Sequence, residues 1–171
     1  SELYGVIREA AGNAVVIACN AVSHLSAGIF EVYRTGDDTS GRLWSRTRAY
    51  GVNTLAFRLC QNDAFYKVDA DCVGIIPGKI DWSLNRQWLD ILSVSGSPLF
   101  VSVKPDNLTD SMKEDIKKAF FRNSEQKDIA EPLDWLYNNQ PQVWLINGEK
   151  REYDFVEKSY PELLSGSTQS Y

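Results

Sequence analysis

The stretch Ala14-Val15-Val16-Ile17-Ala18-Cys19 is the longest purely apolar run in the chain, and it decides the predicted fold class. The run is short, continuous and β-branched in its middle, which is typical of a strand buried on both faces of a parallel sheet. Later apolar stretches predict further strands over residues 29–33, 65–68 and 99–103. Most of these stretches are far enough apart for the chain to cross over, so we expect the strands to run parallel.

Helices are predicted around these strands, because apolar residues recur three or four positions apart. The spacing predicts helices over residues 3–10, 82–95 and 112–120. A further helix is expected between the second and third strands, with Thr39-Ser40-Gly41 as its start.

The alternation of strands and helices favours an α/β fold made of parallel βα units. Four such units amount to half of an eight-stranded TIM (β/α)8 barrel, which usually takes about 250 residues. We therefore predict a half-barrel over residues 1–130. Residues 131–171 are predicted to form a C-terminal extension, with a β-hairpin signal at Asn147-Gly148 and a polar tail from Ser165.

Composition excludes several classes of function. The chain has 18 Lys+Arg against 23 Asp+Glu, a net charge of −5, and its densest basic patch is only three arginines over residues 42–48, so no nucleic-acid partner is expected. Its longest apolar run is far shorter than the roughly 20 residues of a membrane span, so no membrane partner is expected. Cys19, Cys60 and Cys72 are not spaced as metal ligands, and His24 is the single histidine. We expect no metal and no cofactor.

The chain starts at Ser1 without a methionine and without a signal-peptide pattern. We therefore expect an excised piece of a longer protein, and the compartment stays unassigned. A half-barrel also leaves strand edges unpaired at residues 14–19 and 99–103. Because open strand edges recruit partners, we expect homo-oligomers, which light scattering would detect.

Polar residues follow each predicted strand. In parallel α/β sheets, functional groups lie at the carboxyl ends of the strands. The residues in those positions are Cys19, Asn20, Arg34, Asp37, Asp38, Asp69, Asp71, Cys72, Ser102 and Lys104. Such a cluster of charges is the main candidate for a functional site.

At these positions the sequence resembles the retaining α-galactosidases and their relatives, the clan of glycoside hydrolase families 27 and 36. The family carries Arg-x-x-x-Asp on its sixth barrel strand, and Arg34 and Asp38 match that motif. The resemblance implies that Arg34 contacts the sugar and that Asp38 is the catalytic general acid/base. The seventh strand carries Asp-Pro-Asp followed by Cys or Met, matched by Asp69-Ala70-Asp71-Cys72 with Ala70 in place of Pro. Asp71 then corresponds to a sugar-binding carboxylate, with Cys72 beside it.

The resemblance covers residues 14–104 and implies strands five to eight, the C-terminal half of the barrel. Cys19-Asn20 is similar to the end of the family's fifth strand, and Trp44 to an aromatic residue that follows the acid/base loop. The family's nucleophile is an Asp in Lys-x-Asp on the fourth strand, which would lie upstream of Ser1. Lys67-Val68-Asp69 imitates this motif, but it follows the acid/base residue and so lies on the wrong strand.

The resemblance implies an enzyme of carbohydrate metabolism, part of a retaining glycoside hydrolase acting on α-galactosides or related α-glycosides. Its partners would be the carbohydrate substrate and the missing N-terminal half, without which the fragment is expected to be inactive. Two other functions stay open. One is a non-catalytic carbohydrate-binding or scaffold module. The other is a receiver-type signalling domain, which would use Asp37-Asp38 and Lys104-Pro105 with Mg²⁺.

Overall fold

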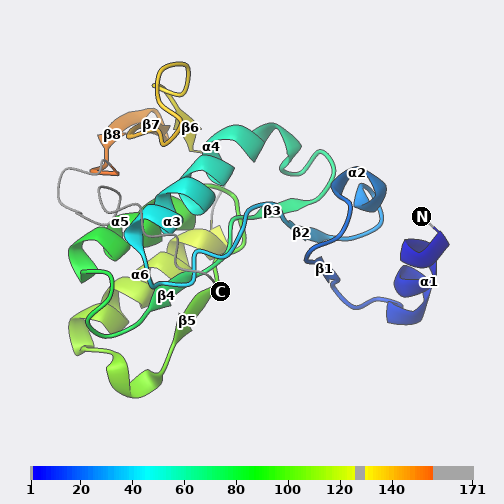
Figure 1. Ribbon diagram of the computed structural model, residues 1–171, viewed down its shortest axis with the longest axis horizontal. Coiled ribbons are helices and arrows are strands. Elements are labelled where there is room, and N and C mark those ends of the chain that lie inside the picture. Colours follow the sequence, from blue (N-terminus) through cyan, green and yellow to red (C-terminus); the bar gives the residue numbers. More distant parts are fainter. Residues whose placement is uncertain (1, 126–129, 156–171) are drawn as a thin grey trace.

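The structure is a computed structural model that describes residues 2–125 and 130–155 (Figure 1). The helices are α1 (Glu2–Ala11), α2 (Ser23–Ser26), α3 (Trp44–Arg46), the π-helix η1 (Thr47–Val52), α4 (Asn53–Arg58), the 3-10 helix η2 (Leu59–Gln61), α5 (Trp82–Ser93), the 3-10 helix η3 (Pro105–Asn107) and α6 (Asp110–Glu125). The strands are β1 (Ile17–Ala18), β2 (Val32–Arg34), β3 (Lys67–Asp69), β4 (Val73–Ile75), β5 (Val101–Val103), β6 (Glu131–Pro132), β7 (Val143–Ile146) and β8 (Glu149–Glu152).

The sheets are small and separate, so the predicted half-barrel is wrong. In the described residues, β1, β2 and β3 form one parallel sheet, and β4 and β5 form a second parallel pair. The third sheet, β6-β7-β8, is antiparallel. The fold is thus mixed helix and strand, with short parallel sheets beside an antiparallel one.

The chain does not build a continuous barrel wall, because its parallel strands are only two or three residues long. Between β3 and β4, Asp71 takes a positive φ of 72°, which breaks the extended backbone and separates the two parallel sheets. The first strand also differs from the prediction of burial on both faces: Val15 is 69% exposed and Ile17 is 47% exposed.

A small apolar core holds the N-terminal sheet together. It consists of Ala18, Phe30, Tyr33, Tyr66 and Val68. Helix α1 lies beside this sheet (Figure 1) and buries none of its residues fully. The helix leaves Leu3 67% exposed and Val6 62% exposed. The self-association expected from unpaired strand edges stays a prediction.

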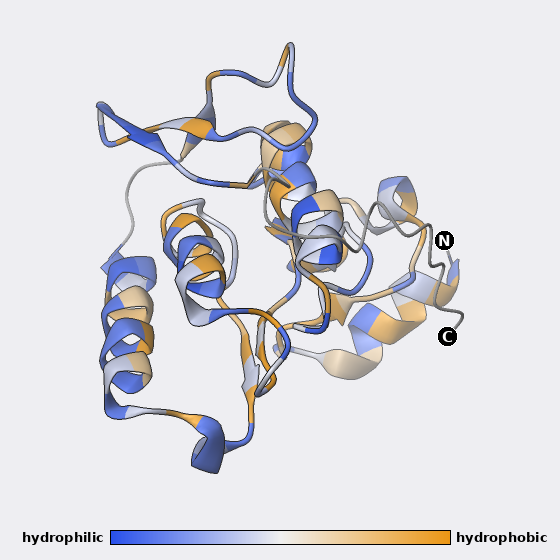
Figure 2. Ribbon diagram, turned by 60° about the vertical axis from the view of Figure 1, so that its left-hand side comes forward, coloured by the Kyte–Doolittle hydropathy of each residue, from blue (hydrophilic) through white to orange (hydrophobic). Residues whose placement is uncertain are grey.

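The larger core joins the helices to the C-terminal sheet. Asp81 caps the start of helix α5, and its side chain accepts a hydrogen bond from the Ser83 N–H at 2.8 Å. The helix buries Trp88 and Leu92 completely, and Trp144 of β7 belongs to the same core. In Figure 2, the helices carry apolar residues on one side and hydrophilic residues on the other. Residues 130–155 therefore contribute to the same core as α5.

A tight backbone crossing fixes the loop after β2. Thr39-Ser40-Gly41 does not begin a helix as predicted, because Ser40 and Gly41 have φ values of 53° and 71°, and the helix starts at Trp44. A Cβ on Gly74 of β4 would lie 2.7 Å from the Gly41 Cα. Only glycine fits at this contact, so the loop is held against β4.

The C-terminal sheet contains a hairpin at the position of the sequence signal. Ile146 of β7 pairs with Glu149 of β8, and Asn147 and Gly148 between them have φ values of 52° and 78°. Two positive φ angles are the requirement of a type I′ turn, which suits Asn-Gly. The polar tail after Ser165 lies outside the described residues. Within the described ranges, no helix has the length and apolar character to cross a bilayer.

Candidate functional site

The ends of β2 and β3 place two opposite charges side by side. In the parallel register, Arg34 is the partner of Asp69, and each is the last residue of its strand. Their side chains are close because the carboxyl ends of neighbouring parallel strands meet at the same edge of a sheet. The Arg34 Nε donates to Asp69 Oδ2 at 2.9 Å.

The Arg34 guanidinium contacts three carboxylates of the predicted site. Besides Asp69, its Nη2 lies 3.0 Å from Asp71 Oδ1, and its Nη1 lies 3.5 Å from Asp38 Oδ1. Burial tends to lower the pKa of Arg34, but the hydrogen bond to Asp69 and the charges of Asp69 and Asp71 outweigh it and raise the pKa. Arg34 therefore stays a cation and holds the cluster together.

Asp71 ties the loop after β2 to the link between β3 and β4. Its Oδ2 accepts a hydrogen bond from the Thr39 N–H at 2.7 Å and lies 3.0 Å from the Thr39 hydroxyl. The Asp71 N–H in turn donates to Asp69 Oδ1 at 2.8 Å. Asp69 and Asp71 are 1% and 7% exposed at their side chains, and each of their oxygens has a partner. The two buried carboxylates therefore hold Arg34 and the loop after β2 in place.

Asp38 is the accessible carboxylate of the cluster, because its side chain is 70% exposed. The preceding residue shapes this turn: Asp37 Oδ1 accepts a hydrogen bond from the Asp38 N–H at 2.7 Å. The other oxygen of Asp37 pairs with Arg46 at 3.1 Å. Asp38 thus faces solvent next to a guanidinium, where a ligand can reach it.

The structure places the remaining predicted site residues differently. Asn20 takes a positive φ of 55° just after β1, and both Cys19 and Asn20 are exposed. Trp44 is 1% exposed and packs against Phe155, with ring centroids 6.1 Å apart. It is a core residue and cannot stack on a sugar.

Sequence reasoning missed Thr39 as a residue of the site. Its side chain is buried, and besides Asp71 its hydroxyl contacts the Cys72 carbonyl oxygen at 2.7 Å. The sequence feature that could have identified Thr39 is the run Thr39-Ser40-Gly41. Short polar side chains form hydrogen bonds in turns as readily as they cap helices.

Cys72 is expected to resist alkylation in the folded protein. Burial, the charge of Asp71 and a hydrogen bond with Asp71 raise the pKa of the Cys72 thiol to about 12. Because the thiolate is the reactive form, iodoacetamide at mildly alkaline pH should modify the exposed Cys19 and Cys60 and leave Cys72 unmodified until the chain unfolds. Mass spectrometry of peptides from native and urea-unfolded protein measures this. Equal labelling of all three thiols in the native protein would contradict the buried site.

The described part of the chain contains no group of three or more His, Cys, Asp or Glu side chains that could hold a metal ion. The carboxylates of the cluster instead share one cation, Arg34. No protein-family model matches this sequence, and no curated protein matches it either.

Proposed function

We propose that this chain supplies the general acid/base and the sugar-binding residues of a retaining glycoside hydrolase that acts on α-galactosides or related α-glycosides. The observation that supports it is the Arg34 guanidinium, which contacts both Asp38 and Asp71. These are the three positions to which the resemblance to α-galactosidases assigns roles. Arg34 and Asp38 lie four residues apart, and Asp71 comes from a separate segment of the chain.

In this proposal Asp38 moves the proton. A retaining mechanism uses two carboxyl groups about 5–5.5 Å apart, one as nucleophile and one as acid and then base. Asp38 protonates the glycosidic oxygen as the bond to the leaving group breaks, and it later takes a proton from the water that releases the sugar. Its 70% exposure leaves it free for both steps.

Asp69 does not suit the role of nucleophile, although Lys67-Val68-Asp69 imitates the motif. Its side chain is 1% exposed, and its two oxygens are occupied by Arg34 and by the Asp71 N–H. The proposal therefore takes the nucleophile from outside the described residues. Asp71 is nearly as buried, so we assign it to positioning Arg34, whose exposed part contacts the sugar.

Sugar binding by the chain itself tests the proposal. Isothermal titration with 1-deoxygalactonojirimycin, a cationic analogue of galactose, should show binding that its glucose-configured epimer does not match. Asp38→Asn should weaken this binding by roughly tenfold, because a charge-assisted hydrogen bond is lost. Asp106→Asn, an exposed carboxylate on η3, is the control and should bind like the unmodified chain.

The outcomes separate the remaining functions. Binding that Asp38→Asn does not weaken would support a carbohydrate-binding module without acid/base chemistry. Absence of binding to either sugar analogue would refute both carbohydrate functions.

A further inference from the structure

A cleft of about 1010 Å³ lies between α5, α6 and the end of β8. Its volume is at the upper end of the range of roughly 300–1,000 Å³ that is usual for ligand pockets. None of the residues discussed for the Arg34 cluster lines it. The cleft is therefore a separate feature of the molecule.

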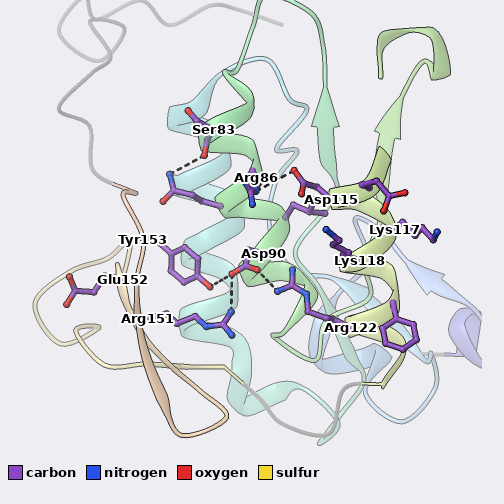
Figure 3. A pocket seen from close by; sticks show the side chains of 14 residues that line it. Ser83, Arg86, Asp90, Asp115, Lys117, Lys118, Arg122, Arg151, Glu152 and Tyr153 are labelled. Carbon is purple, nitrogen blue, oxygen red and sulfur yellow. Dashed lines mark hydrogen bonds and ion pairs between the residues drawn. The ribbon is translucent and has the colours of Figure 1, made fainter. Parts of the chain in front are cut away.

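Asp90 of α5 lies at the centre of this cleft (Figure 3). Arg122 Nη1 contacts Asp90 Oδ1 at 2.5 Å, and Arg151 Nη1 contacts Asp90 Oδ2 at 3.3 Å. The Tyr153 hydroxyl also donates to Oδ2, at 2.7 Å. Two guanidinium groups thus converge on one carboxylate, which neutralises only one of them.

A third cation adds to this excess. Figure 3 shows Lys118 on the side of α6 that faces α5, three residues after Asp115 and four before Arg122. Lys118 makes no ion pair with any described residue, whereas Asp115 is paired with Arg86 at 3.4 Å. Glu152 does not offset the excess, because it pairs with Lys150 at 2.8 Å and points away from Asp90 in Figure 3. Two cations therefore contact Asp90, and Lys118 adds a third cation to the lining of the cleft.

The two arginines also keep donors for a ligand. Each guanidinium has five N–H groups, and Asp90 contacts only Nη1 of each. The Arg122 Nε is buried and has no hydrogen-bond partner among the described residues. Tyr153 does not add a negative charge, since burial and the neighbouring Asp90 both raise the pKa of its hydroxyl.

Apolar surface completes the cleft. Leu89 and Tyr153 are buried beside the charged groups, and Phe121 of α6 is 62% exposed at the rim. A free inorganic anion would leave this surface in water. A ligand that joins an anionic group to an apolar one would cover it.

We propose that this cleft binds a phosphomonoester whose phosphate lies between Arg122, Arg151 and Lys118 and whose aromatic or other apolar group covers Phe121. A phosphomonoester carries a charge of about −1.5 to −2 at neutral pH, which matches the excess of two positive charges. A carboxylate carries a single negative charge and would neutralise only half of this excess. Guanidinium groups also match the geometry of phosphate oxygens with paired N–H donors.

Isothermal titration of the full chain with phenyl phosphate tests the proposal. Phenyl phosphate should bind more tightly than inorganic phosphate and more tightly than benzoate, and benzyl alcohol should not bind. Raising the salt concentration should weaken the binding, because the attraction between exposed charges is screened. Failure of phenyl phosphate to bind at millimolar concentration, or binding no tighter than that of benzyl alcohol, would overturn the proposal.

Lys118→Gln is the decisive variant, because Lys118 has no partner within the described structure and its loss should leave stability unchanged. We expect it to weaken phenyl phosphate binding about fivefold, and Arg122→Gln to weaken it about tenfold or more. Lys79→Gln, which changes an exposed lysine that does not line the cleft, should bind like the unmodified protein. Equal affinity of the unmodified chain and Lys118→Gln would show that the cations serve only to join the helices and would overturn the assignment.

Discussion

Replacing Arg34 by methionine is expected to lower the free energy of unfolding by about 3 kcal/mol, the low end of the cost of breaking a buried ion pair. The reason is that Asp69 and Asp71 would be left as neighbouring buried charges without a cation, while Met keeps the apolar part of the side chain. The low end applies because the Arg34 side chain is still 22% exposed. Urea denaturation of both proteins, followed by circular dichroism, measures the difference.

Two further variants separate charge pairing from packing. Lys67→Met removes an exposed ion pair with Asp63, in which the two side chains are 45% and 57% exposed, and should cost less than about 1 kcal/mol. Adding Asp69→Asn to Arg34→Met should recover part of the lost stability, because one of the stranded charges is removed. A cost for Arg34→Met no larger than that for Lys67→Met would mean that the cluster does not hold the two strands together.

The part of the site at the strand ends could be predicted from the sequence. Apolar stretches located β2 and β3 to within a few residues, and polar residues just after such stretches must gather at one edge if the strands pair in parallel. Arg34 and Asp69 are direct partners in that register. The Asn147-Gly148 turn was similarly visible, because few residue pairs accept two positive φ angles.

The other features of the fold and of the site depend on long-range contacts, which no local sequence pattern predicts. A half-barrel needs neighbouring strands that join into one sheet, but Asp71 adopts a left-handed backbone between β3 and β4. Nothing in local propensity requires an aspartate to do so. Trp44 was expected beside the site, yet it is buried against Phe155, which comes 111 residues later.

The cleft at Asp90 could not be predicted from the sequence for the same reason. Arg122 and Arg151 lie 32 and 61 residues from Asp90 in the sequence, and each is unremarkable in its own segment. Only the packing of α6 and β8 against α5 brings them to one carboxylate. Charge excess at a point is a property of the folded chain, so the sequence-based search for strand-end residues could not find it.

Asp38→Asn is expected to lower the rate of hydrolysis by about 10²–10⁴-fold for substrates with poor leaving groups, in the hydrolase of which we propose this chain forms a part. The amide cannot protonate the departing oxygen. Aryl α-galactosides with activated leaving groups need little protonation, so their first step should be much less affected. Azide should then restore turnover, because it attacks the glycosyl-enzyme intermediate without a general base. Steady-state rates with both substrate types, with and without azide, measure this.

Asp37→Asn is the matched control for that experiment, because it changes the neighbouring carboxylate and keeps the turn. An asparagine side-chain oxygen can still accept the hydrogen bond that Asp37 Oδ1 receives from the Asp38 N–H. Its ion pair with Arg46 involves a half-exposed carboxylate, so little stability should be lost. Activity on poor leaving groups should therefore survive in Asp37→Asn. If Asp37→Asn instead showed rescue by azide and Asp38→Asn did not, the proton donor would be Asp37, and the four-residue spacing from Arg34 would be a coincidence.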